Sequence, residues 1–355
     1  MISLDNKPDL ERVLERVNAW YEGEIVDRAP VNFGCAPEKM DTGELDKMQF
    51  SSLEERWMSV DYQLARVRAE ISHEPILGDG IPNAFFNLGP DFFTSLYGGT
   101  VQFGEDTSWM KPFLDSYDQP VRMQMAGNVY FDAIEKMTAI ALEELKGFAN
   151  VGYTDLHPGL DAVCCMRGNE TLCFDLFEQP DGIKRLGMQT IADYEKLFRH
   201  YNRLVTEHGQ LSISWMGIAS EDSMHIPSCD FSFLISTPQF EEFGLPLLER
   251  EVHFAKHNVF HMDGPGVARH MDLICAVPEI QAVQWMPGAG SMEVMQWIPH
   301  IQKLRAYGKS VVVYITPEEI DEFTAAIPPQ GLYLMCETSD REIQRQVLKK
   351  VENWR

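Results

Sequence analysis

Residues 310–338 read SVVVYITPEEIDEFTAAIPPQGLYLMCET, and this stretch decides the fold class. A β-branched, apolar run (310–316) passes into a polar segment with helical periodicity, and a second apolar run (331–338) follows a Pro-Pro-Gln-Gly break. Strands that are apolar along their whole length and alternate with helices are typical of a parallel sheet covered by helices. We therefore predict a strand–helix–strand unit with parallel strands.

The same alternation recurs along the chain. With the two runs above, eight apolar runs can be read, the others at 29–34, 75–80, 151–157, 211–217, 258–264 and 280–288. Helical patterns separate or follow them at Pro180–Gly209, 237–257, 291–308, 316–327 and 339–354, and residues 1–24 form an N-terminal helix. Eight such units favour a closed (β/α)₈ TIM-type barrel, with residues 1–355 as a single domain. An open doubly wound sheet is the alternative, but no Gly-x-Gly-x-x-Gly follows any strand.

Composition limits the classes of function. The chain has 355 residues and a formal net charge of −24, which disfavours nucleic-acid binding. Its seven cysteines point to reduced thiols rather than a disulfide framework. The charged amphipathic start differs from a signal peptide, and no long apolar run predicts a membrane span, so we expect a cytoplasmic protein. The oligomeric state stays open, a homodimer included.

Polar residues near the ends of the predicted strands are the first functional candidates. The carboxyl ends of barrel strands carry the active site in this fold, whereas the opposite face serves stability. The residues at these positions are Asp79, Asp155, His157, Trp215, His261, Asp263, Gln284, Trp285, Tyr314, Cys336 and Glu337.

Three of these residues form a candidate metal set. His261 and Asp263 are two residues apart on an extended segment, so their side chains leave the same side. Together with Cys336 they would offer zinc (Zn²⁺) three ligands and leave one position for substrate. The alternative is a hydrogen-bonded His261, a loop-capping Asp263 and a core Cys336. The sequence leaves open whether Glu337, Cys229 or Asp230 completes the shell.

Several motifs resemble the uroporphyrinogen decarboxylase superfamily, and more narrowly its corrinoid-linked methyltransferase branch. They are HMDGPG, QWMPGAG, FNLGPDFFTSLYGG, EDTSWMKP, TDLHPGLDA, RGNETLCFDLFEQPDG and CDFSFLISTPQFEEFGLPLLE, in the right order over residues 25–350. The resemblance implies a (β/α)₈ barrel with its site at the carboxyl mouth. Zinc methyltransferases of that superfamily carry His-x-Cys and a later Cys; here the residues are His261, Asp263 and Cys336. Asp263 departs from the pattern, which favours an oxygen-type over a thiol substrate.

The resemblance implies transfer of a methyl group from a small O-methyl or N-methyl donor, such as a methoxyarene, to cobalt. The corrinoid (cobalamin) would arrive on a separate protein, because the chain has no Asp-x-His-x-x-Gly motif. The candidates for proton transfer are Asp79, Asp155, His157 and Tyr314. The candidates for substrate binding are Trp215, Phe231, Trp285 and Asp230, although ordinary barrel packing also explains the aromatic residues.

A metal-free lyase acting on a carboxylated small molecule is the alternative. The decarboxylases of the superfamily bind their tetrapyrrole through an arginine-rich segment after the first strand. This chain has VNFGCAPEKMD there, with Lys39 as its one basic residue. A binder without catalytic activity on the same barrel also stays open.

Overall fold

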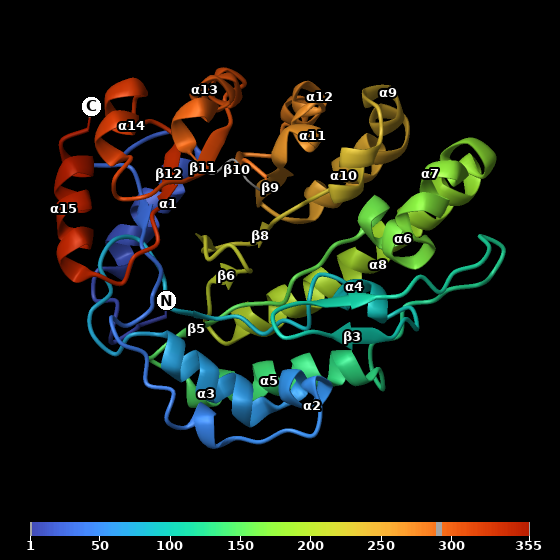
Figure 1. The fold of residues 1–355 in the computed structure, drawn as a ribbon, viewed down its shortest axis with the longest axis horizontal. Coiled ribbons are helices and arrows are strands. Elements are labelled where there is room, and N and C mark those ends of the chain that lie inside the picture. The colour runs from blue at the N-terminus through green and yellow to red at the C-terminus, as the bar shows by residue number, and fades with distance from the viewer. Residues whose placement is uncertain (1, 289–292, 355) are drawn as a thin grey trace.

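A curled parallel sheet forms the centre of the computed structural model, which describes residues 2–288 and 293–354. Its six strands lie in the order β1 (Val31–Asn32), β12 (Leu332–Met335), β11 (Ser310–Tyr314), β10 (Ala282–Met286), β9 (His257–Asp263) and β8 (Met224–His225). All neighbouring pairs are parallel. The parallel strands predicted from residues 310–338 are thus confirmed, and helices lie along the outer side of the sheet (Figure 1).

Among the described residues, shorter strands form three separate two-stranded pairs. β2 (Asn83–Ala84) pairs in parallel with β5 (Asn150–Val151). The Tyr153 amide donates to the Ile213 carbonyl (3.0 Å), which connects β5 to β6 (Ser212–Ile213). β6 pairs antiparallel with β7 (Ala219–Ser220), and β3 (Val101–Phe103) pairs antiparallel with β4 (Ser108–Met110). The protein is therefore a mixed α/β fold with a partly closed barrel, and the fully closed eight-stranded ring stays a prediction.

The predicted strand at 75–80 is a loop, and β2 begins later, at Asn83. The loop passes so close to β1 that a Cβ on Gly78 would lie 2.5 Å from the Val31 carbonyl oxygen, and Gly78 has a φ of +73°. Asp79 therefore precedes its strand instead of following it. Strand β8, which pairs with the start of β9, was not predicted.

Helices separate the strands and cover the sheet (Figure 1). They are α1 (Leu10–Tyr21), α2 (Leu53–Met58), α3 (Val60–Glu70), α4 (Phe92–Ser95), α5 (Val129–Glu144), α6 (Gly159–Arg167), α7 (Asn169–Glu178), α8 (Pro180–Glu207), α9 (Thr237–Gln239), α10 (Leu245–Glu251), α11 (Gly264–Ala268), α12 (Met271–Ala276), α13 (Ile298–Ala306), α14 (Ile320–Ala326) and α15 (Arg341–Glu352). The predicted helices after Pro180 and at the end of the sequence are confirmed as α8 and α15. In the described part of the chain, none of these helices has the length and apolar character needed to cross a membrane.

Helix α1 covers the amino-terminal ends of the strands. The Ser310 hydroxyl, at the start of β11, donates to the Trp20 carbonyl (2.5 Å). The ring of Trp20 packs on Tyr333 with centroids 5.4 Å apart, and Tyr21 stacks on His257, the first residue of β9, at 4.0 Å. Because α1 occupies this edge, the carboxyl ends of the strands form the opposite edge of the sheet.

Candidate active site

A cleft of about 690 Å³ lies beside the carboxyl ends of β5, β8 and β9. His157 follows β5, Asp230 follows β8, and Asp263 ends β9. The lining residues also include Asp91, Asp161, Cys164, Cys165, Phe231, Phe233, Leu234 and Val267. The structure thus brings His157, Asp230, Phe231 and Asp263, all predicted from the sequence, to one concave surface.

His157 is held between two hydrogen-bond partners. Its Nε2 lies 2.7 Å from Asp155 Oδ2, and its Nδ1 lies 2.8 Å from Ser228 Oγ. The Ser228 hydroxyl donates to Asp161 Oδ2 at 3.0 Å, so its oxygen accepts a hydrogen bond from the Nδ1–H of His157. The imidazole therefore donates from both nitrogens and carries a positive charge.

The pKa of His157 agrees with this protonation state. Burial of the ring lowers the pKa of His157, but the charge and hydrogen bond of Asp155 outweigh burial. With smaller contributions from Asp161 and Asp230, the pKa rises to about 10. His157 is therefore a fixed imidazolium at neutral pH, and both of its N–H groups are already in use.

Asp161 and Ser228 complete this network and were not predicted. Asp161 lies in the first turn of α6 and accepts hydrogen bonds from the amides of Asp230 (3.0 Å) and Phe231 (2.9 Å). It therefore fixes the loop that carries two cleft residues. The signal in the sequence was an acidic residue at a helix start in HPGLDA, but its partners lie about 70 positions later and cannot be read locally.

Asp230 is the cleft carboxyl with the most altered acidity. The residue is exposed at the cleft wall, yet surrounding protein removes much of the water around its carboxyl. This desolvation and the negative charge of Asp161 raise the pKa of Asp230 to about 6, and Asp263 adds to the effect. The opposing influence of His261 and His157 is smaller. Asp230 can thus change protonation state close to neutral pH, as an acid or base in catalysis must.

Aromatic and apolar side chains form one wall of the cleft. Phe231 is buried, whereas the side chains of Phe233 and Leu234 are 52% and 49% exposed. A Cβ on Gly266 would lie 1.9 Å from the Phe233 ring, so the ring rests directly on the backbone of α11. Gly266, the second glycine of the HMDGPG motif, therefore allows the Phe233 ring to pack directly against the backbone of α11.

A second group of predicted residues lies farther inside the sheet. The His261 ring packs edge-on against Trp215 with centroids 5.4 Å apart, and its Nδ1 lies 2.5 Å from Gln284 Oε1. The Gln284 amide then donates to the Tyr314 hydroxyl at 2.7 Å. Trp215, Tyr314 and Glu337 also line a separate cavity of about 250 Å³.

The predicted zinc ligands do not converge. His261 and Asp263 share one face of β9, as expected. Cys336 follows Met335, which pairs with Tyr314 on β11 and with Asn32 on β1, and the Cys336 amide donates to the Asn32 carbonyl at 2.8 Å. Alternation places the Cys336 side chain on the opposite face of the sheet from Tyr314, in the core.

Within residues 2–288 and 293–354, no three His, Cys, Asp or Glu side chains are arranged to hold a metal ion. Burial, followed by the charges of Glu318 and Glu319, raises the pKa of the Cys336 thiol to about 12, in keeping with a thiol packed in the core. His261, Asp263 and Cys336 are therefore not arranged to bind one zinc ion together in this structure. Zinc binding by the protein stays a prediction.

We expect Cys336→Ser to lower the free energy of unfolding by about 1–3 kcal/mol, because the serine hydroxyl would be buried without a hydrogen-bond partner. Cys275→Ser, a buried thiol on α12, is the matched control and should cost a similar amount. Urea unfolding and the metal content of both purified variants check this prediction. A loss of zinc in the Cys336 variant alone would contradict the placement of Cys336 in the core.

Trp285 and Asp79 lie away from the cleft. Trp285 pairs with Met262 and Val313, on the face opposite His261, and its ring stacks on His300 with centroids 5.1 Å apart. Trp285 thus packs against the helices outside the sheet and not in the cleft, where its predicted role in substrate binding would place it.

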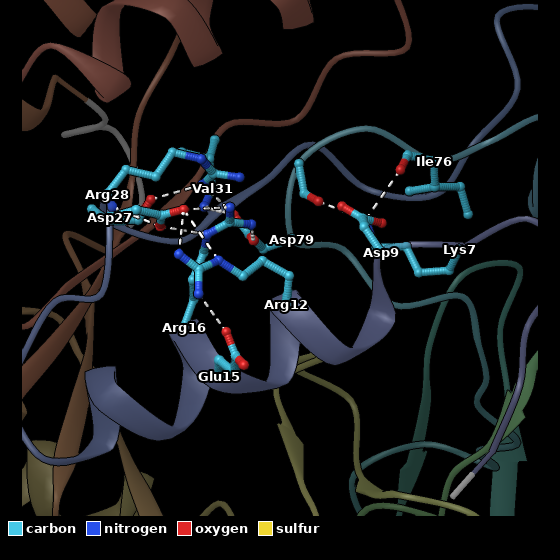
Figure 2. Close-up of polar contacts among 12 residues, drawn as sticks. Lys7, Asp9, Arg12, Glu15, Arg16, Asp27, Arg28, Val31, Ile76 and Asp79 are labelled. Atoms are coloured by element: carbon cyan, nitrogen blue, oxygen red, sulfur yellow. Dashed lines mark hydrogen bonds and ion pairs between the residues drawn. The ribbon is translucent and has the colours of Figure 1, made fainter.

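Asp79 is completely buried near α1. Its carboxylate accepts from Arg16 (3.0 Å), Arg28 (2.5 Å) and the Val31 amide (2.8 Å), as Figure 2 shows. Asp79 was predicted to lie at the mouth, but the strand it was assigned to starts after it. Both carboxylate oxygens are already occupied, so the structure gives Asp79 a role in stability.

Comparison with models of known protein families gives no match, and comparison with curated proteins gives none either. The resemblance to the uroporphyrinogen decarboxylase superfamily therefore stays a prediction. Among solved structures, the chain is similar to a methyltransferase from Methanosarcina mazei, with 10% sequence identity and a TM-score of 0.59. The match covers 96% of this chain and 98% of that chain. The two proteins thus share a fold over nearly their whole lengths.

Proposed function

We propose that the protein is a methyltransferase that moves a methyl group from a small O-methyl or N-methyl donor to the cobalt of a corrinoid (cobalamin) on a partner protein. The observation that carries this proposal is the cleft beside the strand ends, with Asp230 as a carboxyl that titrates near neutrality. The fold shared with a methyltransferase supports it. A volume of about 690 Å³ suits a small organic molecule.

Methyl transfer breaks the bond between the methyl carbon and its oxygen or nitrogen, and the electron pair stays on that heteroatom. A cobalt(I) corrinoid supplies the electron pair for the new bond to carbon. An oxygen leaving group needs a proton, which Asp230 in its acid form can donate. A methylammonium donor already carries a positive charge on nitrogen and leaves as a neutral amine, so it needs no added proton, and there the Asp230 carboxylate would hold the ammonium group in place.

The network around His157 keeps the loop after β8 in position. His157 has no free N–H to offer a leaving group, because Asp155 and Ser228 accept hydrogen bonds from both of its N–H groups. Asp161 anchors the amides of Asp230 and Phe231. These residues thus position the acid rather than act on the substrate.

The alternative lyase would need a site for carboxylates. The described residues that line the cleft include Asp91, Asp161, Asp230 and Asp263, and none of them is Lys or Arg. Bringing an anionic substrate into this surface would be costly. The cleft thus favours the methyl-transfer proposal over the lyase.

The test is anaerobic incubation of the full chain with cob(I)alamin and each donor class. Formation of methylcob(III)alamin, seen by its absorbance spectrum and dependent on enzyme, supports the proposal. Turnover of a carboxylated substrate with release of CO₂, and no methyl transfer from any O-methyl or N-methyl donor, would overturn it.

A further inference from the structure

We infer that the cleft takes its methyl donor as a cation, a methylated ammonium compound with an apolar remainder, rather than as a neutral methyl ether. This inference rests on the proposed function and names the substrate class of the same site. It is carried by the charge of the lining, by the two carboxylates without partners and by the aromatic wall.

The first argument is the balance of charge. Four aspartates and one histidine line the cleft, and the described lining contains no Lys or Arg. His157 carries the one positive charge, and it is already paired with Asp155. A concave surface lined by one sign of charge attracts cations and repels anions.

The second argument is that the carboxylates divide into two kinds. Asp161 accepts three hydrogen bonds from the loop after β8, and Asp91 accepts from the Met110 amide at 2.8 Å. No described residue donates a hydrogen bond to the side chain of Asp230 or Asp263, or forms an ion pair with either. Two carboxylates, one after β8 and one at the end of β9, thus line the cleft with their hydrogen-bonding capacity unused.

The third argument is the aromatic wall. The Phe233 ring packs closely against Gly266 while about half of the residue is exposed, and both Phe231 and Phe233 line the cleft together with Asp230. Methylated ammonium groups bind to aromatic faces because the ring quadrupole attracts the charge and the methyl groups pack on the ring. A carboxylate and an aromatic face in one cleft match the charge and the surface of such a group, whereas a neutral ether would leave the carboxylates unpaired.

The titratable and charged groups around Asp230 are Asp161 on α6, His157 after β5, and His261 and Asp263 on β9. After desolvation, the repulsion of the neighbouring carboxylates is part of what raises the pKa of Asp230 to about 6. A bound cation relieves this repulsion, so we expect the cation to bind the ionised form of the site most tightly.

The experiment is calorimetric titration of the full chain with choline and with its neutral isostere 3,3-dimethylbutan-1-ol, which differ only in the charged nitrogen. We expect choline to bind at least about tenfold more tightly. Asp230→Asn and Asp263→Asn should each weaken choline binding several-fold and leave the isostere unaffected, whereas Asp61→Asn, on the exposed surface of α3, should change neither. The second cleft variant covers the case in which the first does not fold.

Equal affinity for choline and the isostere, or choline binding unchanged in both cleft variants, would overturn the inference. The methyl-transfer assay separates this result from the proposed function. Charge-selective binding without methyl transfer would keep the cleft as a binding site for methylated cations and remove the proposed function. Methyl transfer from a methoxyarene, with equal binding of the isosteric pair, would do the reverse.

Discussion

Asp79→Asn is expected to lower the free energy of unfolding by about 3–5 kcal/mol, the usual cost of removing one partner from a buried ion pair. Asp79 is completely buried, and its carboxylate neutralises Arg28, which is also buried, and pairs with Arg16. Asparagine has a similar shape but no charge, so Arg28 would remain buried without its counter-ion. Urea unfolding of the variant and the wild type measures the difference.

The control is Asp27→Asn in the same cluster. Asp27 pairs with Arg12 and Arg16, but its side chain is 38% exposed, so water screens these pairs (Figure 2). We expect a loss of about 1 kcal/mol or less. The folded Asp79 variant should bind choline like the wild type, because Asp79 lies near α1 and not in the cleft. A loss of binding at unchanged stability would instead place Asp79 in the active site.

Asp230→Asn is expected to lower kcat/KM for methyl transfer by about 10²–10⁴-fold, the range typical of a lost acid or base. Asparagine keeps the size of the side chain but neither donates a proton nor pairs with an ammonium group. The fold should be preserved, because Asp161 holds the loop through the backbone amide of residue 230. Asp263→Asn is the matched control, and its effect should be smaller.

The pH profile of the wild type separates the two roles of Asp230. The pKa of Asp230 is raised to about 6, so the acid form predominates below this pH and the carboxylate above it. If a methyl ether is the donor, kcat/KM falls as the pH rises through about 6, because the proton donor is lost. If a methylammonium compound is the donor, kcat/KM rises over the same range. The Asn variant should show neither change, and a wild-type profile that is flat near pH 6 would exclude both roles.

The sequence predicted strands best where they are long and apolar. Strands β9 to β12 follow from their apolar runs, and the gathering of His157 and Asp263 follows from the rule that parallel strands end at one edge. Asp230 joins them because it follows β8, a strand that was not predicted. The assignment at 75–80 failed because Ile76 and Leu77 are apolar for packing in a loop, and local composition does not distinguish that from a strand. Asp79 was misplaced as a consequence.

The site was harder to predict than the fold because it depends on single-residue register. One position separates Met335, on the face of Tyr314, from Cys336, on the other face, and the sequence alone does not say where β12 ends. The contacts of His157 with Ser228, and of Ser228 with Asp161, join segments about 70 residues apart. Pairings of this kind arise from tertiary structure and leave no periodic trace in the chain.

The packing of α1 has a consequence for synthesis of the protein. The Trp20 carbonyl meets Ser310, 290 positions later, and the Trp20 ring meets Tyr333. The ribosome completes α1 long before these partners emerge. Until then, Leu10, Val13, Leu14 and Val17, which are buried in the folded protein, lack the residues that bury them. The part of the core around α1 can therefore assemble only after the chain has been translated as far as Tyr333.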